Sequence, residues 1–343
     1  MPLPPPSAKA QLEFLAKVER ILAEGQFTTT YKFALLIAIT NIAVEKGSDW
    51  GDELTIDLDD IARQFLSLYW NMARPYPLDK VLKQSTNSKK PATVMRSLSI
   101  ACIQSSSGYA RRRVYRRESC GLISKAKATI KRNVLYRLQS FGGTEMLRKD
   151  SFLYDFPRCA EDCTGLQSIT LKAGASACLR RLRGVIVAMV QARWARWVRG
   201  NNDSLGADRA LEAFMFGAER TDLRMYAKPL YELQAGVCFY SGEKLRSAKA
   251  GHVDHFIPWS RYPFDSPFNL VLASPAVNSA KRDLLAPPSL RKRWQHRNDH
   301  CFGVLTGKLF DAVPTDRDAV HAFAEWIYST QFNRSSASTY AAI

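Results

Sequence analysis

Residues 30–44 form a largely apolar run, and this run constrains the fold more than any other local feature. Thr29 and Thr30 can cap a helix that begins there. A helix that is apolar on every side is buried in the core of a protein or in a membrane. The longest unbroken apolar stretch, Phe33–Ile39, falls well short of the ~20 residues that a membrane span needs. We therefore expect this helix to lie in the core of a globular protein.

The net charge indicates the class of partner. The 343 residues include 49 Lys and Arg against 32 Asp and Glu, which leaves a charge of +17. Such an excess favours a polyanion as partner and excludes an acidic, solvating protein. The N-terminal residues lack a charged, apolar or lipidation signal, so we expect a cytoplasmic protein that binds no membrane. Seven cysteines, an odd number without a repeated spacing, argue against a disulfide framework.

The periodicity of apolar residues predicts a mainly α-helical chain. We expect a helical, basic region over residues 1–200 and a second domain over 201–343, because a Gly-Asn-Asn-Asp run follows a long helix near residue 200. The first region can divide into a small helical or winged-helix-like module, 1–78, and a basic helical part, 93–200. Apart from the buried helix and a short strand at 54–57, the expected helices are 8–23, 57–72, 175–198, 209–235 with a break at Pro229, and 316–331.

The excess positive charge gathers in three runs. Residues 111–132 hold nine Lys or Arg against one acid, with two tyrosines in or beside the run. Basic side chains also line the expected helix between Arg180 and Arg199 and the segment 291–297. Such runs are typical either of a solvated face or of a surface that follows a phosphate backbone. The expected phosphate contacts in the first and last runs are Arg111, Arg112, Arg113, Arg291 and Arg293.

A pattern of strand, loop, strand and helix runs from residue 252 to residue 282. His252–Asp254 is short and extended, and a second, aliphatic strand covers residues 269–273. Ser274 and Pro275 then form a helix start, with serine at the N-cap and proline at the first helical position. The helix would place Asn278, Lys281 and Arg282 on one face.

These side chains suit hydrolysis of a phosphodiester. A hard divalent cation prefers oxygen ligands, and Asp254 and the amide of Asn278 can supply two. The imidazole of His255 can take a proton from an attacking water, because its unperturbed pKa lies near working pH. Lys281 can hold a phosphate oxygen.

Asp254-His255, Asn269 fifteen residues after Asp254, and Asn278 nine residues further on resemble the HNH, or ββα-metal, endonuclease family. The resemblance covers residues 238–286. It implies that Asp254 and Asn278 hold one divalent ion, Mg²⁺ or Mn²⁺, and that His255 is the general base. It also implies that Asn269 holds the metal-binding loop and the base in place.

The sequence departs from the family pattern at the cysteines. Many members hold a structural zinc with two Cys-x-x-Cys pairs, but here only Cys238 remains. We therefore expect no structural zinc and a buried, apolar Cys238. His252 can assist at the metal or be a plain strand residue. Arg261 and Arg282 are further candidates for contact with the DNA backbone.

Three functions remain open. The first is a DNA endonuclease that nicks one strand per site of double-stranded DNA with little sequence specificity, as a monomer or a homodimer. The second is a degenerate HNH fold that only binds DNA or docks a partner, and the third is RNA cleavage. A nuclease with a helical N-terminal module also resembles effectors of bacterial anti-phage systems, the Zorya type among them, in which other subunits of the system would be partners. A restriction or mobile-element endonuclease is the competing setting.

Overall fold

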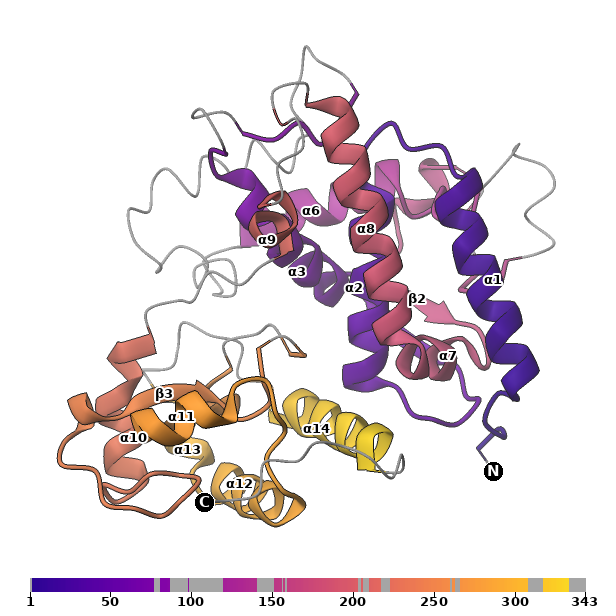
Figure 1. The fold of residues 1–343 in the computed structure, drawn as a ribbon. Helices are drawn as coiled ribbons and strands as arrows, with labels where there is room; N and C mark the ends of the chain where they lie inside the picture. Colours follow the sequence, from indigo (N-terminus) through magenta and orange to yellow (C-terminus); the bar gives the residue numbers. More distant parts are fainter. Residues whose placement is uncertain are drawn as a thin grey trace. The chain divides into compact units, whose positions relative to one another are not determined.

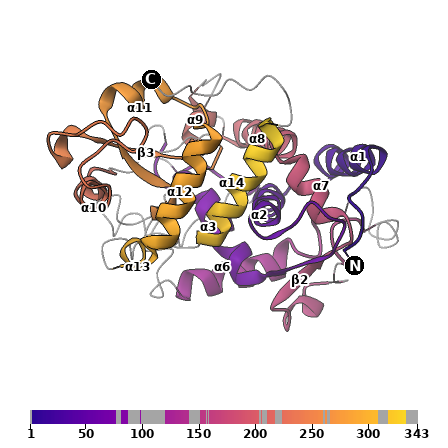
Figure 2. The same cartoon turned by 90° about the horizontal axis from the view of Figure 1, so that it is seen from below.

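The computed structural model describes residues 2–76, 81–86, 98, 120–140, 151–155, 157, 159–202, 205, 210–216, 223–259, 261–262, 266–307 and 317–332. The chain is mainly helical and forms two compact units, Met1–Gly217 and Ala218–Ile343 (Figures 1 and 2). Each unit is described by itself. No helix in the described part of the chain is both long and apolar enough to cross a membrane.

The first unit is built around helix α2 (Tyr31–Lys46). Of its 16 residues, 14 are buried, so the helix has no solvent-facing stripe. Helices α3, α7 and α8 pack against it (Figure 1). The burial expected from the apolar run is confirmed, because a helix of this composition is stable only where neighbours cover all its faces. Thr30 occupies the N-cap position, but its side chain bonds elsewhere, to Gln84 and Tyr69.

The other elements of the first unit surround this helix. The N-terminal helix α1 begins after Ser7, whose hydroxyl accepts a hydrogen bond from the Ala10 N–H at 3.2 Å. Strands β1 and β2 form an antiparallel pair. The bounds are α1 Ala8–Glu24, β1 Leu54–Asp57, α3 Leu58–Tyr69, η1 Asn71–Ala73, α6 Cys120–Asn133, η3 Glu161–Cys163, β2 Ser168–Leu171, α7 Ala175–Arg181, α8 Arg183–Asn201 and α9 Leu211–Phe216.

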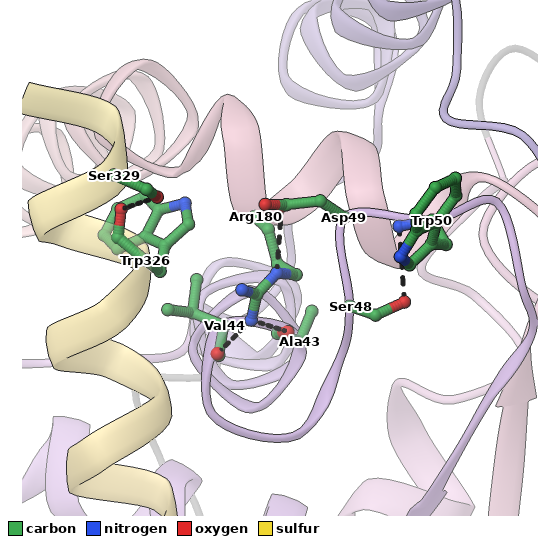
Figure 3. Close-up of polar contacts among 8 residues, drawn as sticks. All are labelled: Ala43, Val44, Ser48, Asp49, Trp50, Arg180, Trp326 and Ser329. Atoms are coloured by element: carbon green, nitrogen blue, oxygen red, sulfur yellow. Dashed lines mark hydrogen bonds and ion pairs between the residues drawn. The ribbon is translucent and has the colours of Figure 1, made fainter. Parts of the chain in front are cut away.

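The single helix expected over residues 175–198 is two helices, α7 and α8, separated at Leu182. Arg180, in the last turn of α7, is only 6% exposed. Its guanidinium donates hydrogen bonds to the carbonyls of Ala43 and Val44 at the end of α2, and it pairs with Asp49 (Figure 3). The break lets α7 and α8 each pack on α2 in its own direction. Arg180 therefore caps a helix and does not belong to a DNA-binding surface.

The boundary between the two units follows Gly217, later in the sequence than the boundary expected near residue 200. Helix α9 follows that position, yet it packs against α8 and η1 of the first unit. Pro229 is not a helix break either. It lies in the first turn of α10 (Ala227–Leu233), where a missing backbone N–H leaves no hydrogen bond unmade.

The second unit packs helices around two short strands. Strands β3 and β4 are antiparallel, with Asp254 opposite Val271 and His255 opposite Leu270. Trp294 is fully buried and stacks on Phe256, with ring centroids 4.7 Å apart. Besides α10, the elements are η4 Leu223–Tyr226, η5 Ala248–Ala250, β3 His252–His255, η6 Pro267–Asn269, β4 Leu270–Ala273, α11 Pro275–Lys281, α12 Pro288–His300, α13 Phe302–Leu305 and α14 Arg317–Phe332.

Some of the predicted sites lie outside the described residues. Arg111, Arg112 and Arg113 belong to this group, and only the later part of the basic run, within α6, is described. The sequence predictions for α1, β1, α3, α11 and α14 are confirmed to within a few residues.

Candidate active site

Strand β3 carries the acidic and imidazole side chains of the candidate site at its C-terminal end. Asp254 and His255 are its last two residues. The Asp254 side chain is 16% exposed, and the ring of His255 lies 4.9 Å from that of Trp259 at 65°. His252 is exposed and shares the strand face of Asp254, since alternate strand residues point the same way.

One oxygen of the Asp254 carboxylate is held from two sides. The hydroxyl of Tyr240 donates a hydrogen bond to Oδ2 at 2.6 Å, and Nζ of Lys281 lies 3.0 Å from the same atom. Burial, together with the charge of Asp254, keeps the pKa of Tyr240 well above its ordinary value. Tyr240 therefore stays protonated and acts as the donor in this pair.

Lys281 faces inward. Its side chain is 1% exposed, and its ammonium also donates a hydrogen bond to the backbone carbonyl of His255 at 2.9 Å. This geometry corrects the expected role at a phosphate oxygen, because an ammonium engaged beneath the strand is not presented to a substrate. No local pattern indicated these contacts, since His255 and Asp254 lie 26 and 27 positions away from Lys281 along the chain.

Asn269 is fully buried and clamps the chain after His255. Its side-chain oxygen accepts a hydrogen bond from the N–H of Ile257 at 2.8 Å, and its Nδ2 donates to the carbonyl of the same residue at 3.0 Å. Its own carbonyl accepts from the N–H of Phe256 at 2.7 Å. These three bonds hold the backbone immediately after the imidazole against the start of β4.

Helix α11 carries Asn278, the second candidate metal ligand, and contacts β3. Ser274 is its N-cap and accepts a hydrogen bond from the Val277 N–H, and Pro275 is its first residue, as predicted. Asn278 lies one turn before Lys281 and therefore on the same helix face. Because Lys281 reaches Asp254, this face of α11 is the one that packs on β3.

The donor set fits a hard divalent cation. Asp254 and Asn278 offer one carboxylate and one amide oxygen, and Mg²⁺ is bound through one or two such groups while it keeps several waters. Within the described residues, no three His, Cys, Asp or Glu side chains gather as a metal-binding group. One carboxylate and one amide oxygen are hard ligands, which would suit Mg²⁺ or Mn²⁺ better than the Cys and His ligands typical of structural zinc.

Cys238 is buried as expected, but its surroundings are polar. Burial raises the pKa of its thiol, while hydrogen bonds from the Ser241 side chain and from the backbone of Ser241, Ser274 and Tyr240 lower it, and the net pKa lies below the ordinary value. The sulfur thus links the chain before β3 to the start of α11 through hydrogen bonds.

Gln234, at the end of α10, is a structural residue that the sequence analysis missed. Its side chain accepts a hydrogen bond from the Leu272 N–H and donates one to the Leu272 carbonyl, both at 2.8 Å. It thereby holds β4 on the side away from β3. A lone glutamine at a helix end carries no sequence signal for such a role.

The basic residues around the site divide into two groups. Arg297 donates hydrogen bonds to the carbonyls of Leu270 and Phe268, and burial lowers its pKa to about 10. The guanidinium groups of Arg291 and Arg293 stack on aromatic rings, 5.2 Å and 4.8 Å from the ring centroids. Arg297 is thus held by backbone carbonyls, whereas Arg293 lies over its ring and stays exposed, so the α12 run is partly structural.

Two further candidates are Arg261, between β3 and β4 along the chain, and Arg282, after α11. Arg282 is exposed directly after α11, and its φ of 47° is not helical, so it does not continue the helix face of Asn278 and Lys281 as expected. Arg261 is half-buried, and this burial lowers its pKa.

Two families match the chain. Residues 238–286 match the HNH endonuclease family, so an endonuclease domain occupies the segment that holds the candidate site. Residues 11–213 match a domain of unknown function, DUF8808. No curated protein and no solved structure matches the chain.

Proposed function

We propose that this chain, which belongs to the DUF8808 family, is a metal-dependent endonuclease that hydrolyses phosphodiester bonds of DNA. The observation that carries the proposal is the joint support of Asp254 and His255 at the end of β3. Lys281 bonds the side chain of the first and the backbone of the second, and Asn269 holds the residues that follow. This arrangement lies inside the HNH endonuclease match.

In this proposal each side chain has one task. The imidazole of His255 takes a proton from the attacking water. Asp254 and Asn278 hold a divalent ion, Mg²⁺ or Mn²⁺, and Asn269 keeps the loop and the imidazole in place. The bound ion neutralises charge on the scissile phosphate and stabilises the leaving oxygen. Each site holds one base and would activate one water, so it would cut one strand, and double-strand cleavage would need a homodimer or two successive events.

The substrate preference follows from charge. The net charge of +17 suits contact with the phosphate backbone of double-stranded DNA, which carries no sequence information. Arg261, Arg282 and the three arginines at 111–113 are the proposed contacts. We therefore propose cleavage with little sequence specificity.

The proposed setting is anti-phage defence. The support is the arrangement of the chain alone: a helical N-terminal unit, itself of unknown function, precedes the endonuclease domain. Restoration of phage plating by His255→Ala in cells that express the chain with its neighbouring genes would support this role. Equal plating on both strains would count against a defence role and favour a mobile-element nuclease.

Relaxation of supercoiled plasmid with Mg²⁺ tests the chemistry. Wild type is expected to give nicked circles, and His255→Ala is expected to leave the plasmid intact at equal protein concentration. Equal relaxation by both proteins would reject His255 as the base, and no relaxation by wild type would favour a fold that only binds DNA. Parallel digestion of labelled DNA and RNA decides between the two substrates.

A further inference from the structure

We infer that Tyr240 and Lys281 are positioning residues that hold Asp254 through Oδ2 alone, so that only Oδ1 serves the metal ion. Lys281 in particular competes with the ion for the carboxylate. It lowers the affinity for the metal and fixes the geometry of the ligand. This inference rests on the proposed function.

The three residues come from separate parts of the second unit. Tyr240 precedes η5 and β3, Asp254 is in β3, and Lys281 ends α11. Both donors end on the same atom, at 2.6 Å and 3.0 Å, and the Lys281 ammonium lies 5.5 Å from the centroid of the Tyr240 ring. With one carboxylate oxygen engaged by two donors, rotation of the carboxylate would break both contacts at once.

The second bond of Lys281 extends the effect to the base. Its ammonium donates to the His255 carbonyl at 2.9 Å, so one buried group supports the backbone of the base and the side chain of the ligand. Asn278 is one turn away on the same helix. The contact therefore also sets the distance between α11 and β3, the two elements that carry the ligands.

Electrostatics predicts that this arrangement weakens metal binding. A fixed ammonium beside Asp254 repels a divalent cation, and in a partly buried site this repulsion is weakly screened. Removal of the charge should strengthen metal binding, while loss of the fixed geometry should slow cleavage. A role limited to fold stability predicts no such opposite changes.

The test compares two variants that remove different parts of the arrangement. Lys281→Met removes the charge and both contacts at similar side-chain length. We expect Mn²⁺ to bind about threefold tighter by titration calorimetry, while plasmid nicking at saturating Mn²⁺ becomes about 10- to 100-fold slower. Tyr240→Phe removes one neutral donor and keeps the ring. Its Mn²⁺ affinity should stay within about twofold of wild type, and nicking should slow about fivefold.

Matched controls are available within the same unit. Tyr231→Phe removes a hydroxyl that donates to the Leu245 carbonyl outside the site, and Lys244→Met removes an exposed charge. Both should keep wild-type nicking and metal affinity. In Lys281→Ala, added n-propylammonium should restore nicking in proportion to its concentration, whereas n-propanol should not.

The outcomes separate the inference from the proposed function. Unchanged nicking in Lys281→Met, weaker Mn²⁺ binding in that variant, or no rescue by the amine would overturn the inference. If Lys281→Met does not fold, Tyr240→Phe decides, and wild-type nicking by that variant would overturn the inference. If instead Asp254→Asn binds Mn²⁺ with wild-type affinity, Asp254 is not a metal ligand and the proposed function fails.

Discussion

Asn269 bonds both backbone groups of Ile257, accepting from its N–H at 2.8 Å and donating to its carbonyl at 3.0 Å. Both residues are fully buried, so water cannot replace either bond. The clamp begins two residues after the imidazole of His255. The backbone that carries the proposed base is therefore held by a side chain from the start of the next strand.

Asn269→Ala should destabilise the second unit by about 3 kcal/mol, because two buried backbone groups lose their partners. Thermal unfolding measures the loss. Tyr231→Phe, which gives up a single hydrogen bond at 3.2 Å, is the reference and should cost about 1 kcal/mol. Equal melting temperatures for the two variants would contradict the importance of the clamp.

Arg180→Met should cost about 3 kcal/mol, because the carbonyls of Ala43 and Val44 lose their donor at a buried helix end. Asp49→Asn is the matched control for Arg180→Met. It weakens only the ion pair with a half-exposed carboxylate, so it should cost less than about 1 kcal/mol. Urea unfolding of both variants tests the difference, and similar midpoints would show that the capping bonds contribute little.

Lys32 predicts a specific pH dependence of stability. Burial, with Arg137 as a nearby cation, lowers its pKa from 10.5 to about 8 in the folded protein. Between these values the unfolded chain binds the additional proton, so the contribution of Lys32 to stability rises with pH, by about 3 kcal/mol in total. The stability difference between wild type and Lys32→Met should therefore shift in favour of wild type from pH 8 to 10.5. A difference that is constant over this range would contradict the lowered pKa.

No structural zinc is expected at Cys238, so EDTA should leave the melting temperature of the unloaded protein unchanged. Cys238→Ala should lower it, because the buried backbone N–H groups of Ser274 and Tyr240 lose an acceptor, at a cost of about 1–3 kcal/mol. A large drop in melting temperature with EDTA would instead reveal a metal that supports the fold.

DNA binding should weaken steeply with salt. If Arg111, Arg112 and Arg113 each contact a phosphate, their joint replacement by Gln should reduce the slope of log K against log salt by about 2.7. Arg20→Gln removes a charge already paired with Glu24 on α1 and serves as control. Fluorescence anisotropy of labelled duplex at several salt concentrations measures both, and an unchanged slope in the triple variant would place the contacts elsewhere.

Local patterns predicted much of the fold because their causes are local. The all-apolar run predicted the buried α2, and the Ser274-Pro275 pair predicted the start of α11. The spacing of Asp254, His255, Asn269 and Asn278 led to the endonuclease family that residues 238–286 match. Capping, amphipathic periodicity and short motif spacing act over a few residues, so they can be recognised without the tertiary structure.

The sequence by itself therefore determined the helical class, the buried central helix and the segment that carries the proposed chemistry. The tertiary structure alone decided where the long basic side chains point. Arg180 turns to a carbonyl 137 positions away, and Lys281 turns to His255 and not toward a substrate. Their direction depends on partners distant along the chain, because a charged group that becomes buried must find an acceptor there. The number of Lys and Arg residues in a segment therefore does not show which of them support the fold and which are available to bind DNA.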